Sequence, residues 1–168
     1  MMDLVDIING QWAKERPDLF TDELGLINRI VVLEKYLQHF LTEALTEFDL
    51  TVWEFDVLAT LLRQGAPYCL SATQLATSAM LSASAMTNRV DRLSARNLVV
   101  REPAEIDRRA VYVKLTELGH ELANQALTAR AKMARQLTES LTKSDIATAN
   151  RLLRHLLCSL EPVSQAVD

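Results

Sequence analysis

Residues 70–117 read LSATQLATSAMLSASAMTNRVDRLSARNLVVREPAEIDRRAVYVKLTE, and the expected architecture follows from this stretch. Ser71 followed by Gln74 is a capping box, in which each side chain covers a backbone donor at a helix start. It predicts a short helix to about Ala79. Ser82 is a suitable N-cap for a second helix shortly afterwards. Two short helices joined by a tight turn are typical of a helix-turn-helix.

The second helix has one apolar and one polar face. Its apolar residues recur at helical spacing and predict a buried side, made of Ala85, Met86, Val90 and Leu93. Small hydroxyl and amide side chains near the start of such a helix can approach base edges in DNA. We therefore expect these residues on the polar side to contact DNA: Ser82, Ser84, Thr87, Asn88 and Arg92.

A β-hairpin is expected after this helix. Residues 98–100 and 110–115 are rich in β-branched and aromatic residues, and a polar connection separates them. Arg108 and Arg109 lie in that connection, and arginines at the tip of such a wing suit a narrow, electronegative minor groove. Asp107 is expected to hold one of them. A solvated turn with an internal ion pair is the alternative for this triplet.

Several segments resemble a known family. Residues 107–119, DRRAVYVKLTELG, resemble the D-x-R…V-x-L-T-x-x-G signature of the MarR family of winged-helix regulators. Residues 11–19 (QWAKERPDL), 54–61 (EFDVLATL) and 65–68 (GAPY) resemble the PecS-like, urate-responsive subgroup. The resemblance covers roughly residues 5–160. It implies a ligand-responsive DNA-binding transcriptional regulator, expected to be a repressor.

Composition and charge bound the function. A chain of 168 residues with 49% hydrophobic and 24% charged residues is an ordinary size and composition for one globular domain. No apolar run is long enough to span a membrane, and the acidic N-terminus does not resemble a signal peptide, so we expect a cytoplasmic protein. The net charge is −4, yet residues 82–114 hold seven Lys/Arg against four acids. That locally basic segment can still engage phosphates.

Further helices are expected on both sides of this lobe. A short one ends before Pro17, because proline restricts the preceding residue. A long one begins near Thr21 or Asp22 and runs to about Phe48, and Thr51 begins a mostly apolar helix to about Arg63. Thr116 begins a helix to about Glu139, and a last, leucine-rich helix begins near Thr142.

The fold class expected is therefore mainly α with a small β-hairpin: a winged helix-turn-helix with N- and C-terminal dimerisation helices. We divide the chain into an extra N-terminal helix (1–20), dimerisation helices (21–50 and 116–168) and the DNA-binding lobe (51–115). The terminal helices carry more apolar surface than one lobe can bury, so we expect a homodimer that binds a palindromic operator.

The resemblance also implies ligand-binding residues: Trp12, Asp56, Arg89 and Arg101. Planar guanidinium groups and an aromatic ring suit urate or a similar small anionic effector. Each residue has a structural alternative, since Trp12 could anchor its helix, Asp56 could join an ion pair and the arginines could bind phosphate. Asp56, Thr60 and Arg63 fall in one narrow polar arc of an apolar helix, so Asp56 is expected to face either an arginine or a ligand cavity.

Other functions remain open at this point. A redox-sensing regulator would switch through Cys69 or Cys158, both of which we expect to be buried, and a regulator of the same family could respond to phenolic ligands. No enzyme motif is present. His39 with Glu43, and Glu117 with His120 and Glu121, have a spacing that could hold a metal, but solvated helices produce such pairs often, and no metal or other cofactor is expected.

Overall fold

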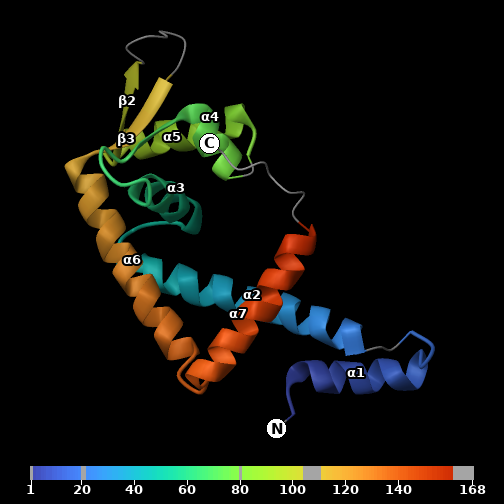
Figure 1. Ribbon diagram of the computed structural model, residues 1–168. Helices are drawn as coiled ribbons and strands as arrows, with labels where there is room; N and C mark the ends of the chain where they lie inside the picture. Colours follow the sequence, from blue (N-terminus) through green and yellow to red (C-terminus); the bar gives the residue numbers. More distant parts are fainter. Residues whose placement is uncertain (1, 20–21, 80, 104–110, 161–168) are drawn as a thin grey trace.

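The computed structural model describes residues 2–19, 22–79, 81–103 and 111–160 (Figure 1). The order of elements within these residues is α1 (Leu4–Glu15), α2 (Asp22–Thr46), α3 (Val52–Leu62), β1 (Cys69–Ser71), α4 (Ala72–Ser78), α5 (Ala83–Ala95), β2 (Val99–Pro103), β3 (Val111–Leu115), α6 (Glu117–Leu137) and α7 (Lys143–Leu160). This is the mainly helical winged helix-turn-helix expected from the sequence.

The predicted helix starts are confirmed. Capping boxes begin α3 at Thr51 and α4 at Ser71, and Ser82 and Thr116 accept backbone hydrogen bonds at the starts of α5 and α6. At α7, the Asp145 backbone N–H donates to Thr142 Oγ1, and the Thr142 N–H donates to Asp145 Oδ2. Short polar side chains therefore set where these five helices begin.

Helix ends differ slightly from the expectation. Helix α2 ends at Thr46, two residues before Phe48. Asp49 has a left-handed φ of 50°, and the Leu50 N–H donates to the Leu45 carbonyl oxygen at 3.3 Å. This arrangement closes the helix C-terminus, and periodicity of apolar residues does not reveal it. Similarly, α3 ends at Leu62 and α6 at Leu137.

The sheet has three strands rather than the two of the expected hairpin. Strands β2 and β3 pair antiparallel, with Arg101 opposite Val113, and β1 pairs with the other edge of β3, giving the order β1-β3-β2. Strand β1 has three residues, too few to produce an alternating pattern. It also leads directly into α4, because Ser71 is both its last residue and the N-cap of that helix.

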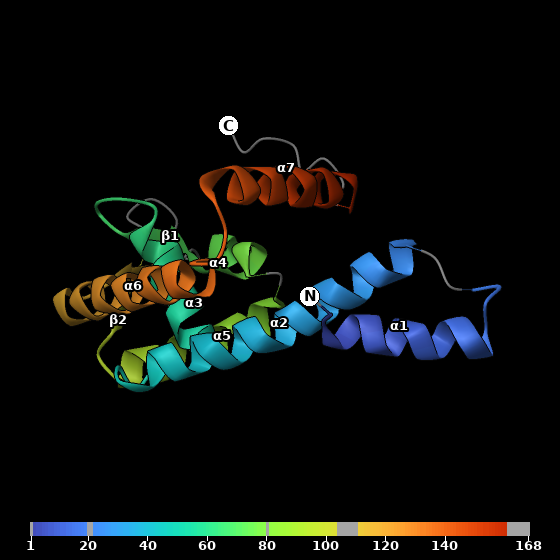
Figure 2. The same cartoon turned by 90° about the horizontal axis from the view of Figure 1, so that it is seen from below.

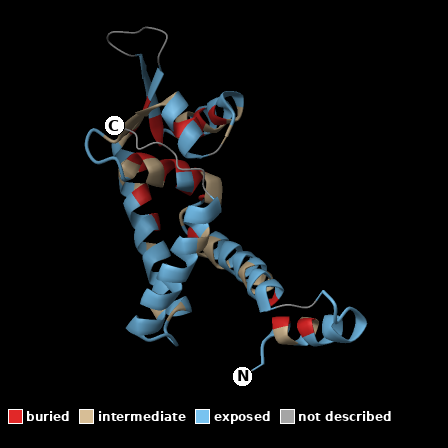
Figure 3. Ribbon diagram, turned by 45° about the vertical axis from the view of Figure 1, so that its right-hand side comes forward, coloured by how far each residue is buried: buried red, intermediate tan, exposed pale blue. Residues whose placement is uncertain are grey.

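The core lies where α3, α5, α6 and the sheet meet. Buried residues gather in this lobe, while α7 and the distal half of α6 are mostly exposed (Figure 3). Phe55, Leu58 and Leu61 of α3 are completely buried. The mostly apolar helix is therefore central, as its composition predicted.

Helices α1, α2 and α7 extend away from the lobe. Arg29 of α2 fixes α1 through Asp3 and Asp6. Helix α7 crosses α2 in one view, but the perpendicular view shows the two helices apart (Figure 2). No residue of α7 is buried. Among the described residues, no helix is both long enough and apolar enough to cross a membrane.

Candidate DNA-binding surface and ligand cavity

Helix α5 presents the polar face that the sequence predicted. Met86, Val90 and Leu93 are buried, whereas the proposed DNA contacts are all exposed: Ser82, Ser84, Thr87, Asn88 and Arg92. Ser82 Oγ accepts a hydrogen bond from the Ala85 N–H at 3.3 Å and lies 3.1 Å from Ser84 Oγ. Hydroxyl groups are thus concentrated at the exposed N-terminus of the helix, which is a favourable place for a phosphate.

The base of the hairpin is attached to α5 by one arginine. Arg101 Nη2 lies 2.8 Å from Asp91 Oδ1 and donates to the Thr87 carbonyl oxygen at 3.1 Å. This contact fixes the direction in which the hairpin leaves the helix. The expected tip residues Asp107, Arg108 and Arg109 lie outside the described residues.

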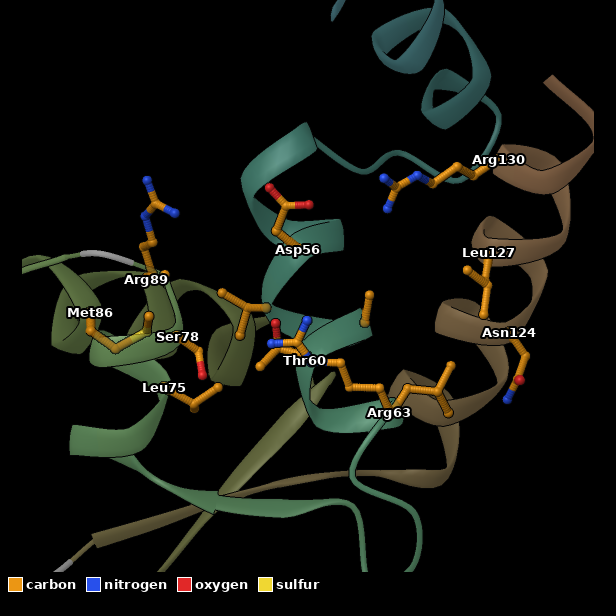
Figure 4. A pocket seen from close by; sticks show the side chains of 14 residues that line it. Asp56, Thr60, Arg63, Leu75, Ser78, Met86, Arg89, Asn124, Leu127 and Arg130 are labelled. Atoms are coloured by element: carbon orange, nitrogen blue, oxygen red, sulfur yellow. The ribbon is translucent and has the colours of Figure 1, made fainter. Parts of the chain in front are cut away.

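A cavity of about 690 Å³ lies between α3, α4, α5 and α6 (Figure 4). Its lining includes the three residues of the polar arc predicted on α3, and Arg89 of α5. The charged and polar lining residues are Asp56, Thr60, Arg63, Ser78, Arg89, Asn124 and Arg130. Asp56 therefore lines a cavity and lies near the positive charges of Arg130 and Arg89; whether the cavity binds a ligand stays a prediction.

The cavity is electrostatically positive. Desolvation raises the pKa of Asp56 above its ordinary value, and the positive charges of Arg130 and Arg89 oppose that rise. Three arginines, with Arg63 as the third, line the space against this single carboxylate. Such a lining suits a small anion with planar hydrogen-bonding groups.

Arg130, Asn124 and Leu127 are lining residues that sequence reasoning missed. They belong to α6, more than sixty residues after α3 in the chain. Long-range packing brings them to the cavity, and no local motif points to them. Arg130 also lies over the Phe55 ring, with Cζ 5.5 Å from the centroid, so the core aromatic helps to place it.

The other two expected ligand residues lie elsewhere in the single chain. Arg101 contacts α5 and does not line the cavity. Trp12 is 54% exposed and lines a separate, mostly apolar hollow of about 320 Å³ with Arg16, Leu19, Leu24 and Asn28. A helix rises about 1.5 Å per residue, so most of the length of α2, on the order of 30 Å, separates Trp12 from Asp56.

The two cysteines differ from the expectation. Cys69 is half-buried, and desolvation together with Glu102 raises its thiol pKa, which disfavours the reactive thiolate. Cys158 is exposed rather than buried, and it lies on α7, in which none of the described residues is buried. Within the described residues, no three His, Cys, Asp or Glu side chains are grouped so as to hold a metal ion.

Comparison with known proteins agrees with this arrangement. Residues 48–110 match the sequence model of the MarR family. The chain is 31% identical over 160 residues to the HTH-type transcriptional regulator PecS of Dickeya dadantii, covering 93% of this chain and 96% of that protein. Both the matched family and PecS are transcriptional regulators and not enzymes. This agrees with the expectation that the chain is not an enzyme.

Solved structures give the same result. A mutant MarR from Escherichia coli, complexed with operator DNA, superposes with a TM-score of 0.71 at 30% identity and covers 83% of this chain and 98% of that chain. AbsC, a MarR family transcriptional regulator from Streptomyces coelicolor, superposes with a TM-score of 0.76 at 26% identity, over 84% of this chain and 96% of its own. The chain therefore belongs to the MarR family of transcriptional regulators.

Proposed function

We propose that this chain binds a palindromic operator as a homodimer, acts as a repressor in the cytoplasm, and is released from DNA by urate or a related small anion. One observation carries the ligand part of the proposal. Arg89 lies on α5, whose exposed face would contact DNA, and it also lines the cavity that holds Asp56. A ligand that binds Arg89 would thereby act on the helix that reads DNA.

Binding of DNA is supported by the surface of α5 and by the relatives. The helix exposes hydroxyl, amide and guanidinium groups, and the segment from residue 82 to 114 has a net charge of +3. The similar E. coli MarR has been solved with operator DNA. We place α5 in the major groove and the hairpin, with Arg108 and Arg109, against the adjacent minor groove.

Dimerisation is supported by apolar surface that the single chain leaves exposed. Helix α2 exposes Leu26, Ile27, Val31, Leu33 and Leu37, and helix α7 exposes Leu152, Leu153, Leu157 and Leu160. Contiguous apolar faces of this kind mark an interaction surface. A two-fold dimer through these helices presents two copies of α5 to one duplex and matches a palindrome.

The effector class follows from the charges of the cavity. Urate is a planar monoanion with several carbonyl and N–H groups, and it fits guanidinium donors and one carboxylate acceptor. The resemblance to the PecS-like subgroup adds Trp12 and Arg101 as expected ligand residues. Because Trp12 lies far from Asp56 within one chain, its contribution would require the second subunit or a rearrangement of α1.

Release then follows from differential affinity. If urate binds better to the conformation in which Arg89 is drawn into the cavity, the ligand favours that conformation at the expense of the DNA-bound one. The two recognition helices must lie about 34 Å apart to read successive major grooves. The loss of DNA affinity cannot exceed the ligand's preference for the second conformation.

The test is a titration of labelled operator DNA with protein, with and without urate. The wild type should bind more weakly with urate, and Trp12→Ala should lose that response while it retains operator binding. Arg89→Ala should also lose the response, although it removes a positive charge from the DNA-binding helix. Phenolic anions and purines serve as competing effectors. A wild-type operator affinity that none of these compounds changes would contradict the ligand part of the proposal.

A further inference from the structure

Trp53 of α3 contacts two arginines of the recognition helix. The Arg89 guanidinium carbon lies 5.3 Å from the centroid of the indole ring, and that of Arg92 lies 5.4 Å from it. Both distances are within the range of a cation–π interaction, for which tryptophan is the best aromatic partner. Trp53 itself is half-buried.

The two arginines face different parts of the molecule. Arg89 is half-buried and lines the cavity beside Asp56, whereas Arg92 is exposed and does not line it. They are three residues apart on α5, so they lie next to each other on the helix surface. One indole ring is thus shared between an arginine of the cavity and an arginine expected to contact DNA.

We propose that Trp53 is a positioning residue that couples the ligand cavity to the DNA-binding surface through these two arginines. This inference rests on the proposed function, which supplies both the anion that binds in the cavity and the DNA that α5 contacts. Two positive charges at one ring repel each other, so each weakens the other's contact with the indole. An anion in the cavity draws Arg89 away from the ring, and Arg92 then has the ring to itself.

The consequence for DNA binding has a definite sign. An Arg92 side chain held on Trp53 is less available to a phosphate or a base, so occupancy of the cavity weakens operator binding. A cation–π contact at a partly exposed site corresponds to about a two- to fivefold change in an equilibrium. Trp53 should therefore account for about a two- to fivefold part of the loss of operator affinity that urate causes. The rest of that loss would arise from displacement of α5.

The first arm of the test uses the ligand-free protein and no DNA. The indole N–H signal of Trp53 is followed by ¹⁵N NMR and is assigned with Trp53→Phe, which leaves only the Trp12 signal. The Trp53 signal should shift in Arg89→Gln and also in Arg92→Gln, and Lys132→Gln on α6 is the matched control that should leave it unchanged. A Trp53 signal that shifts in only one of the two arginine variants would contradict the claim that Arg89 and Arg92 both contact the indole ring.

The second arm measures operator affinity with and without saturating urate. Trp53→Leu keeps an apolar side chain without an aromatic face, and it should reduce the urate-induced loss of affinity by about two- to fivefold. Trp53→Phe restores an aromatic face and should recover part of the response, which a merely structural role would not explain. Thermal unfolding of both variants confirms that they fold.

The two arms separate this inference from the proposed function. If the wild type binds operator and responds to urate, an unchanged response in Trp53→Leu overturns the inference alone. If the wild type does not respond to urate, the proposed effector is wrong, and the NMR arm still decides whether the two arginines share the ring. If the Trp53 signal ignores both arginines, the inference fails whatever the effector is.

Discussion

Gly119 is the glycine at the end of the family signature, and its environment explains why a glycine stands there. A Cβ at this position would lie 1.9 Å from the carbonyl oxygen of Leu98, which follows α5. Nearby, the Thr116 side chain donates to the Asn97 carbonyl oxygen at 2.7 Å and accepts from the Gly119 N–H at 2.9 Å. The start of α6 is therefore held directly against the segment between α5 and the hairpin.

We expect Gly119→Ala to lower the free energy of unfolding by about 1–3 kcal/mol or more, because the backbone contact must open to admit the methyl group. Gly10→Ala is the matched control. Gly10 lies within α1 with no atom within 4 Å of a Cβ, so alanine there should be neutral or slightly stabilising. Urea denaturation of both variants checks the pair. Equal stabilities would show that α6 does not need this close approach.

Glu54 gives a prediction about pH. Its side chain is 8% exposed and accepts hydrogen bonds from the Thr51 N–H at 2.9 Å and from Arg96 Nη1 at 2.9 Å. Burial by itself would raise the pKa of this carboxyl, but the Thr51 and Arg96 hydrogen bonds outweigh it and lower the pKa below the ordinary value of about 4.5. The charged form is thus the one that the fold stabilises.

A lowered folded-state pKa means that the contribution of Glu54 is fully present above the unfolded value and is lost as pH falls through the folded value. Wild type should therefore lose stability more steeply than Glu54→Gln as the pH falls below the ordinary glutamate pKa of about 4.5, because glutamine cannot titrate there. Denaturation midpoints measured across that range give the two slopes. If the stability of Glu54→Gln fell as steeply with pH as that of wild type, other carboxyl groups would be responsible for the acid sensitivity.

Arg130 is one of the three cavity residues named above that the sequence did not reveal. It approaches Asp56 closely enough to oppose the rise in that carboxyl's pKa, and it lines the same space as Arg89. We expect Arg130→Gln to weaken urate binding by about tenfold or more, because a hydrogen bond to a charged group contributes about 1.5–3 kcal/mol. Lys132→Gln makes the same charge change on α6 outside the cavity and should not alter the affinity. Calorimetry without DNA measures both.

At the scale of elements, local chemistry explains the successes of the prediction. Ser71, Ser82, Thr51 and Thr116 are capping residues, and a cap depends on a few neighbouring atoms, so the sequence alone identifies these helix starts. The polar arc of α3 was equally local, and its three residues line the cavity, which was one of the two alternatives expected for Asp56.

The elements that were missed depend on contacts distant in sequence. Strand β1 exists because Cys69 and Leu70 pair with β3 more than forty residues later. The second wall of the cavity comes from α6, whose lining residues have no pattern of their own. The exposure of Cys158 has the same origin, since the described part of the chain buries none of the leucines around it.

The exposed leucines of helix α7 give a prediction about the dimer interface. These leucines should form the dimer contact, so Leu153→Glu combined with Leu157→Glu should convert the dimer to a monomer by placing two charges in an apolar interface. Ser144→Glu combined with Ala147→Glu adds the same charges on exposed positions of the opposite side of α7 and should leave the dimer intact. Sedimentation velocity distinguishes the species. If the leucine variant remained dimeric, the dimer interface would have to lie on another helix.

The molecule as a whole combines three parts. The lobe around α3 and α5 holds the DNA-reading helix, α2 and α7 offer apolar surface for a second subunit, and the cavity lies directly behind α5. A small anion bound in that cavity, as we propose, would therefore act on the part of the molecule expected to meet DNA. Two-fold symmetry then makes any change in α5 occur twice, at both halves of an operator.

Selection of bound sequences from a pool of random duplex DNA tests this arrangement most directly. The selected sequences should converge on a palindrome whose half-sites are centred about one helical turn apart, about 10 base pairs, and two chains should bind each duplex. Affinity for that sequence should fall steeply with salt, because the basic surface releases counterions from phosphates. Enrichment of a single asymmetric site bound by one chain, or no enrichment at low salt, would contradict it.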